Sequence, residues 1–211
     1  MSDYGYTLDA TSARNAESIG KFIRDTGKYK GVFTRAELLI STEKGSRGIE
    51  FDFVSDGKEC TLQLWTHSGT GEPYSALNMV NAIMTCLALR GIQPKKMVVE
   101  KYDYDSKQRH KVEVTAFPDL MNKTIGLLLQ KELSIYNNKE RSKMLIFAAF
   151  NAESEKTSTE ILDKIAQPSA LAKLDLLLAD KDNRKSGQAI QSQQQSKTTN
   201  AYAALDDDLP F

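Results

Sequence analysis

The sequence predicts a mostly β protein with added helices towards its C-terminal end. Apolar and polar residues alternate with a period of two in several segments between about residues 29 and 150, and turn-forming residues separate these segments. Apolar residues recur at helical spacing in one internal segment and again after residue 158. The composition, 40% hydrophobic and 27% charged over 211 residues, is that of an ordinary globular domain.

The first three expected strands form a meander from about 29 to 67. The first strand alternates between an apolar face and a second face that carries Phe33 and Arg35. The second and third strands are joined at Asp56-Gly57, which is a strong signal for a two-residue hairpin turn because both positions of that turn need positive φ. This turn therefore defines the register between the second and third strands.

A helix follows the meander, with Leu77 to Leu87 at helical spacing, Ser75 as the expected N-cap and Gly91 as the expected C-cap. Four more strands are expected at 96–104, 110–116, 124–136 and 142–150, and two helices at 158–166 and 168–180. Three strands, a helix and further strands is the order of an OB-fold barrel, whose sheet face and loops bind oligonucleotides. The expected fold is thus an OB-fold barrel followed by C-terminal helices.

The charges are distributed unevenly along the chain. The 28 basic and 28 acidic residues give a net charge of zero, but residues 21–150 carry a balance of +5. Residues 1–20 and 151–180 carry −2 and −3. Sign asymmetry of this kind is more informative than the sum, and it predicts a mildly basic central block.

Three regions are expected: a folded domain at 1–180, a linker at 181–205 and an acidic tip at 206–211. The linker is polar and rich in Gln and Ser, so it cannot bury enough apolar surface to fold and is expected to be disordered. The tip consists of Asp206, Asp207, Asp208, Leu209, Pro210 and Phe211. An apolar plug beside carboxylates suits a basic-rimmed pocket on a partner protein, and a solubilising tail is the alternative.

Several classes of protein are excluded or disfavoured. Cys60 and Cys86 are too few for a disulfide scaffold or a multi-cysteine zinc site, and His67 and His110 are not at metal-binding spacing. No apolar run approaches the roughly 20 residues that span a bilayer, and the N-terminus lacks the pattern of a secretory signal. We expect a cytoplasmic protein with reduced thiols, no cofactor, no metal and no membrane partner.

One enzymatic alternative stays open. Glu50 with Asp52, or Asp103 with Asp105, could hold a divalent metal in a nuclease, although acidic pairs at a spacing of two are more typical of a solvated strand face. The glycine-rich stretch 69–73 lacks the Lys-Ser/Thr of a phosphate loop. The sequence favours a protein that is not an enzyme.

Aromatic residues beside cations are the strongest binding signal. If Leu62 and Leu64 point into the core, Trp65 faces outward, and Phe33 shares the non-core face of its strand with Arg35. Bases stack on aromatic rings, and cations neutralise phosphates. We therefore expect this sheet face to bind single-stranded nucleic acid, the alternative being that these rings pack beneath the C-terminal helices.

The expected hairpin at 101–111 interleaves aromatic and basic residues. The turn between the first two strands adds Lys44 and Arg47, and the start of the strand that leads into this hairpin adds Lys95 and Lys96. A solvated hairpin is the alternative. The predicted DNA-binding residues are Phe33, Arg35, Lys44, Arg47, Trp65, Lys95, Lys96, Lys101, Tyr102, Tyr104, Lys107, Arg109 and Lys111.

The acidic end DDDLPF resembles the C-terminal tip of bacterial single-stranded DNA-binding proteins. The stretches 44–51, 62–66 and 77–87 resemble a family of bacteriophage and prophage single-stranded DNA-binding proteins, and the resemblance covers most of residues 28–180. It implies an OB-fold that coats single-stranded DNA in replication, recombination and repair, and a tip that docks on replication and repair enzymes. A phage-encoded protein of this kind would act in the cytoplasm of the bacterial host.

The chain departs from the bacterial tetrameric proteins in its extra strands and helices at 124–180. These could cap the barrel or cover a tetramer surface, so we expect a monomer or dimer. A recombination annealing or adaptor protein, whose main ligand is another protein, remains the alternative to DNA coating.

Overall fold

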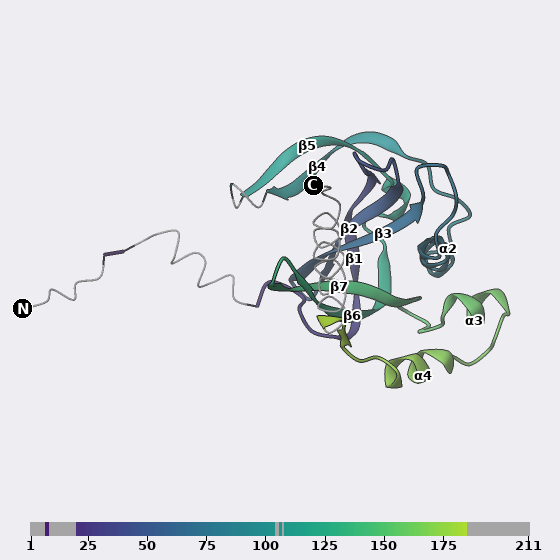
Figure 1. The fold of residues 1–211 in the computed structure, drawn as a ribbon. Coiled ribbons are helices and arrows are strands. Elements are labelled where there is room, and N and C mark those ends of the chain that lie inside the picture. The colour runs from purple at the N-terminus through teal and green to yellow at the C-terminus, as the bar shows by residue number, and fades with distance from the viewer. Residues whose placement is uncertain (1–6, 9–19, 104–105, 107, 185–211) are drawn as a thin grey trace, which may run out of the picture.

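The structure is a computed structural model, and it describes residues 7–8, 20–103, 106 and 108–184. Over these residues the chain is mostly β, with few helices, and its strands form an open, largely antiparallel sheet (Figure 1). In chain order the elements are β1 (Gly27–Ile40), β2 (Arg47–Ser55), β3 (Lys58–His67), α2 (Ala76–Cys86), β4 (Lys95–Asp103), β5 (Gln108–Ala116), a short 3-10 helix (Pro118–Leu120), β6 (Thr124–Tyr136), β7 (Lys139–Phe150), α3 (Ser158–Leu162), α4 (Ala170–Leu176) and β8 (Lys181–Asp182).

The sheet is organised around β1, which changes partner along its length. Its first half pairs with β6, from Gly27 opposite Leu129 to Val32 opposite Thr124, and its second half pairs with β2. β5 joins β1 at one position, and β4 pairs with β5. On the other side of the sheet β7 pairs with β6 and also contacts β3. No hydrogen-bonded ladder joins β3 to β7 within the described part of the chain, so the barrel is not closed.

Two tight turns fix the register of the long hairpins. Asp56 and Gly57 have φ values of 49° and 74°, which confirms the two-residue turn predicted between β2 and β3. Asn137 and Asn138, at 51° and 58°, form the same kind of turn between β6 and β7. β7 therefore begins at residue 139, three residues before the predicted start.

α2 lies where the sequence predicts a helix, but its ends differ in detail. Ser75 is at the N-cap without a side-chain hydrogen bond to the helix, and the C-cap is Leu87 rather than Gly91. Ala88 takes the left-handed conformation that stops the helix, with φ of 55°. The buried side of α2 packs against both β3 and β7, at one end of the curled sheet.

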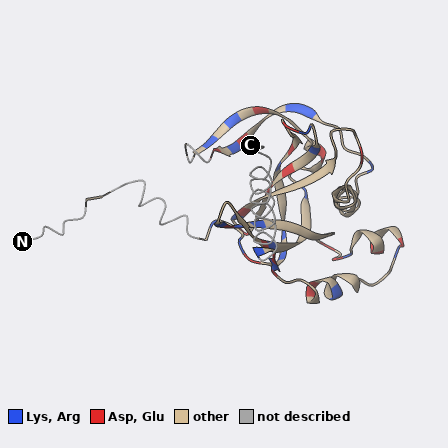
Figure 2. Cartoon of the chain, in the orientation of Figure 1, with Lys and Arg blue, Asp and Glu red and all other residues tan. Residues whose placement is uncertain are grey.

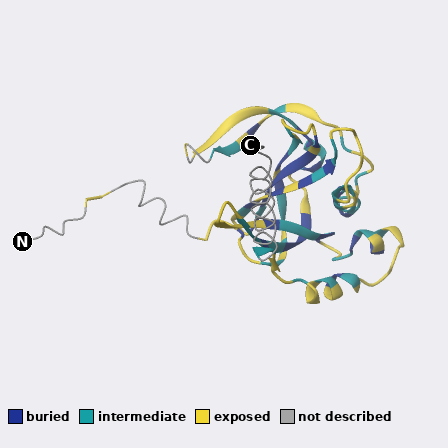
Figure 3. Cartoon of the chain, viewed as in Figure 1, coloured by how far each residue is buried: buried dark blue, intermediate teal, exposed yellow. Residues whose placement is uncertain are grey.

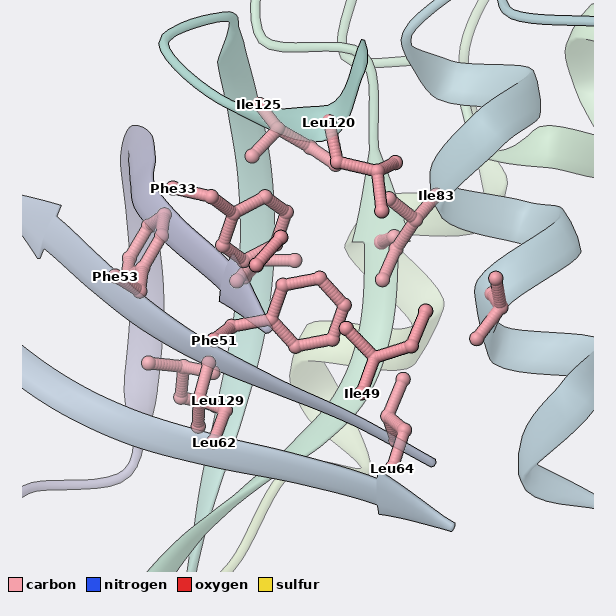
Figure 4. Packing of buried hydrophobic residues seen from close by; sticks show 14 of the residues in the cluster. Phe33, Ile49, Phe51, Phe53, Leu62, Leu64, Ile83, Leu120, Ile125 and Leu129 are labelled. Carbon is pink, nitrogen blue, oxygen red and sulfur yellow. The ribbon is translucent and has the colours of Figure 1, made fainter. Parts of the chain in front are cut away.

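The core fills the inside of the curl (Figure 4). Phe33, Phe51 and Phe53 are fully buried, and the Phe33 ring centroid lies 4.5 Å from that of Phe51 and 5.7 Å from that of Phe53. Ile83 from α2 and Leu120 from the 3-10 helix complete this side of the core. Burial follows the inward face of the strands, while the outer side of the β4–β5 hairpin stays exposed (Figure 3).

The C-terminal helices are shorter than predicted, and one side chain joins them. The Glu160 carboxylate accepts hydrogen bonds from the backbone N–H groups of Thr157 (2.9 Å), Ser169 (2.6 Å) and Ala170 (2.9 Å). It therefore caps the N-termini of both α3 and α4. These backbone hydrogen bonds, from Ala170 first, lower the pKa of Glu160 to about 2.

α4 covers the side of β6 and β7 that faces away from the main core, where Leu171 packs with Leu128 and Phe150. Beyond it, Lys181 and Asp182 form β8, parallel to β6. The rest of the predicted linker and the whole acidic tip lie outside the described residues. In the described part of the chain, every helix is too short or too polar to cross a bilayer.

Candidate nucleic-acid interface

The face of β1, β2 and β3 that points away from the core, here called the outer face, holds most of the predicted site. It carries Arg35, Glu37, Glu50, Asp52, Thr61, Gln63 and Trp65. The β4–β5 hairpin arches over part of this face (Figure 1). Between hairpin and sheet lies a cavity of about 170 Å³, whose lining includes Arg35, Gln63 and Tyr102.

Arg35 is buried on the outer face, so its predicted contact with DNA is wrong. Its side chain is 3% exposed, and Nε and Nη2 donate to the two oxygens of Asp52, both at 2.9 Å. Nη2 also donates to Glu50 at 2.7 Å, and Nη1 donates to Glu37. Although burial lowers it, hydrogen bonds and charge from Asp52 and Glu50 hold the pKa of Arg35 above its ordinary value. Arg35 is a structural cation that neutralises carboxylates.

Phe33 was predicted on the outer face but lies in the core, because β1 contains a β-bulge. Phe33 is opposite Phe53, yet Arg35 is opposite Asp52, so Thr34 is an extra residue in the strand. Positions 33 and 35 would share a face in a regular strand. The bulge turns the Phe33 ring inward and leaves Arg35 on the outer face.

Lys101 reaches from β4 down to the same cluster of charges. Its Nζ lies 3.0 Å from Glu37 and 3.8 Å from Glu50, and its side chain is 37% exposed. Gln63 and Thr61 donate to the carboxylates of β2 at 2.6 and 3.0 Å. Lys101 was predicted to contact DNA; in the structure its ammonium group connects the hairpin to the sheet.

The structure describes both residues of one acidic pair of the nuclease alternative and one residue of the other. Glu50 and Asp52 are both bonded to a buried guanidinium, which would repel a divalent cation. Asp103 is described, whereas Asp105 lies outside the described residues. Among the residues that the structure describes, no three His, Cys, Asp or Glu side chains form a group that could hold a metal ion.

Trp65 is half-buried and lies on the outer face, opposite in direction to the buried Leu64. Its cross-strand neighbour is Gly48, where a Cβ atom would lie 2.5 Å from the Leu64 carbonyl oxygen. Gly48 therefore contributes no side chain that could cover the indole. The exposed Arg47 begins β2, and Lys44 is exposed in the preceding turn, so both predicted cations stay available at this end of the outer face.

The β4–β5 hairpin presents the other predicted cations. Lys95, Lys96 and Lys111 are exposed, and blue segments follow the hairpin in Figure 2. Arg109 is ion-paired with Glu59 of β3. Arg109 therefore lies beneath the hairpin, where it lines a cavity with Glu59 and Tyr102, whereas Lys95 and Lys96 lie at the start of β4, away from the hairpin tip.

Tyr102, next to the hairpin tip, is partly buried and lines three adjoining cavities over the end of β3. Tyr102, one of the two aromatic residues predicted in the hairpin, therefore borders the outer face. Tyr104 and Lys107 were also predicted to contact DNA; both lie outside the described residues.

Two features near this end of β3 were not found from the sequence. Residues 21–23 pair with β3 through Ile23 N to Glu59 O (2.9 Å) and Glu59 N to Lys21 O (2.8 Å), which brings Phe22 and Arg24 to the site. No strand periodicity marks that short segment, so nothing local indicates the pairing.

The second missed feature is Lys143, one of three cations on β7. Lys139, Arg141 and Lys143 alternate along the strand and share one face, a signal that the sequence does contain. Lys143 lines the cavity next to β3, whereas Lys139 and Arg141 are not among the residues that line it.

Comparison with known proteins finds no matching family model, no matching curated protein and no matching solved structure.

Proposed function

We propose that this protein binds single-stranded DNA, largely without sequence preference, and that it is not an enzyme. The observation that carries the proposal is the position of Trp65 and Tyr102 along one sheet face whose ends carry cations. Arg47 precedes Gly48, which lies opposite the tryptophan, and Arg109 lies opposite the tyrosine. Aromatic rings accept any base, and lysine and arginine neutralise phosphates without reading sequence.

We also propose an OB-type barrel. β1, β2, β3, α2, β6 and β7 follow the OB order, with the β4–β5 hairpin inserted after the helix. Two observations support it: β1 pairs with both β2 and β6, and α2 packs against both β3 and β7. In OB-folds the face of the second and third strands binds oligonucleotides, and here that is the outer face. On this proposal the strands at 124–150 belong to the barrel itself. The additions are the β4–β5 hairpin and a cap formed by α3 and α4.

The proposed role is to coat single-stranded DNA during phage replication, recombination and repair in the bacterial cytoplasm. The tip at 206–211 would recruit partner enzymes through its carboxylates and apolar end. The support for this role is the resemblance of the tip and of the central stretches to phage and bacterial single-stranded DNA-binding proteins. A monomer or dimer remains the proposed state.

The test is a titration of the full chain with oligo-dT while tryptophan fluorescence is recorded. Trp65 is the only tryptophan, so the signal reports on the outer face. We expect strong quenching that weakens as salt rises, because stacking and phosphate contacts act together. Absence of binding at low salt would overturn the proposal and favour the adaptor alternative. Cleavage of the oligonucleotide in the presence of magnesium would favour the nuclease.

A further inference from the structure

The seam between β3 and β7 contains an open cavity of about 580 Å³, within the range of small-ligand sites. Its lining comes from four separate parts of the chain and includes Phe22, Arg24, Glu59, Thr61, Tyr102 and Lys143. It shares Tyr102 and Thr61 with the cavity of the outer face, so the two cavities are neighbours.

Backbone pairing holds Phe22 at this cavity. Ile23 is 3% exposed and anchors the segment in the core, while its backbone N–H donates to the carbonyl oxygen of Glu59. Phe22, the preceding residue of this paired segment, is 38% exposed. An aromatic ring that is fixed in place and left open to solvent is available to a ligand. Tyr102 supplies a second ring to the same cavity.

Cations outnumber carboxylates around this cavity. The Arg24 guanidinium lies 5.4 Å from the Phe22 ring centroid, and Lys143 has a side chain that is 64% exposed. Lys143 shares its carboxylate partner, Glu132, with Lys181, each at 2.9 Å, so one negative charge faces two positive charges.

The neighbouring cavity of the outer face has the opposite balance. There, Arg35 and Lys101 face the three carboxylates of Glu37, Glu50 and Asp52. A phosphate would be repelled by that cluster and attracted to the seam. The backbone of a bound strand is therefore expected to run towards the seam after it crosses the end of β3.

We propose that the seam cavity is a subsite for one nucleotide of single-stranded DNA. The base stacks on Phe22 and Tyr102, and the adjoining phosphate contacts Arg24 and Lys143. The inference rests on the proposed function and extends the DNA path beyond the sheet face that OB-folds use. It makes the segment at 21–24 part of the binding site.

The test compares two aromatic–arginine pairs of the full chain for binding to oligo-dT. Phe22→Ala with Arg24→Gln removes the pair at the seam, and Tyr136→Ala with Arg141→Gln removes a matched pair at 4.9 Å on the β6–β7 hairpin. We expect the seam variant to lose about tenfold in affinity, the effect of one lost stacked base. Its salt slope should fall by about 0.7, the value for one phosphate contact on a single strand.

The control variant should bind within about twofold of the unmodified chain, and Phe22→Tyr, which keeps the ring, should retain affinity. Arg24→Gln alone, at an exposed position, should still lower the salt slope and covers the case in which the double variant unfolds. If oligo-dT quenches Trp65 in the unmodified chain and binds the seam variant with the same affinity, the subsite is overturned and the proposed function stands. Equal losses in both pairs would also overturn the subsite, and no binding by the unmodified chain would overturn both.

Discussion

Arg35 makes three neighbouring carboxylates tolerable on a sheet face that the β4–β5 hairpin covers. Without its charge, Asp52, Glu50 and Glu37 would repel one another, with only the half-exposed Lys101 to compensate. Removing one partner of a buried ion pair costs roughly 3–5 kcal/mol. We expect Arg35→Gln to lower the free energy of unfolding by about 3 kcal/mol in a urea titration. Lys101→Gln is the control and should cost below about 1 kcal/mol, because that group is part-exposed; equal losses would contradict this account.

The two cysteine thiols are expected to be unreactive in the folded protein. Burial raises the pKa of Cys60 to about 12, with the charges of Asp52 and Glu59 adding to it, and burial raises the pKa of Cys86 to about 12. Only the thiolate attacks an aromatic disulfide reagent such as DTNB. Near pH 8 we expect negligible labelling of the native chain and two reactive thiols in concentrated urea. Rapid labelling of one thiol without denaturant would show that its burial is incomplete.

At the scale of elements, Glu160 connects α3 to α4 and makes their docking sensitive to acid. Its folded-state pKa of about 2 lies below the ordinary value of 4.5. A lowered pKa stabilises the fold above the ordinary pKa, and this contribution is lost as pH falls from about 5 towards 2. Glu160→Gln should therefore cost about 2 kcal/mol at neutral pH.

Thermal or urea unfolding of Glu160→Gln across this pH range checks the prediction. The difference in stability between the variant and the unmodified chain should shrink as pH falls from about 5 towards 2. Glu153→Gln, at an exposed position in the loop before α3, is the control and should have little effect. A difference that stays constant with pH would contradict the capping role.

The β4–β5 hairpin is expected to contribute to binding more than to stability. Glu100 is paired with Lys111, so residues 101–110 can be replaced by Asn-Gly, which suits a two-residue turn between paired positions. None of the described residues removed is fully buried, and they include Tyr102 and Arg109. We expect a folded protein with about tenfold weaker binding to oligo-dT and a shallower salt slope. Unchanged affinity, measured by anisotropy of a labelled oligonucleotide, would remove the hairpin from the DNA path.

The order of strands and helices could be predicted from local patterns. β6 has the predicted bounds of 124–136, and the turn at Asp56-Gly57 is where its sequence requires it. The bulge at Thr34 could not be predicted, because its cause is the pairing of β1 with β2 rather than a pattern within β1. For the same reason the sequence assigned Phe33 to the wrong face.

The residues of the candidate site could be predicted only in part, because contacts between segments distant in sequence bring several of them together. Trp65 could be assigned to the outer face because two buried leucines on the same strand fix the alternation. Phe22 could not, since its position depends on pairing with Glu59, 37 residues later in the chain. The ion pairs of Lys101 and Arg109 likewise require the hairpin to fold back over the sheet, which strand periodicity does not encode.

At the scale of the whole molecule, a net charge of zero is compatible with DNA binding because the charges are segregated. The block at 21–150 carries the balance of +5, whereas Asp206, Asp207 and Asp208 are adjacent in the tip. An acidic peptide on the same chain competes with phosphates for the same cations. We expect a chain that ends after Leu205 to bind oligo-dT several-fold more tightly at low salt, with the gain disappearing near about 0.3 M salt, where charges are strongly screened. Replacing the three aspartates by asparagine in the full-length chain should reproduce the gain, because charge rather than length causes the competition. Affinities that do not change at low salt in either variant would show that the tip does not contact the DNA-binding face.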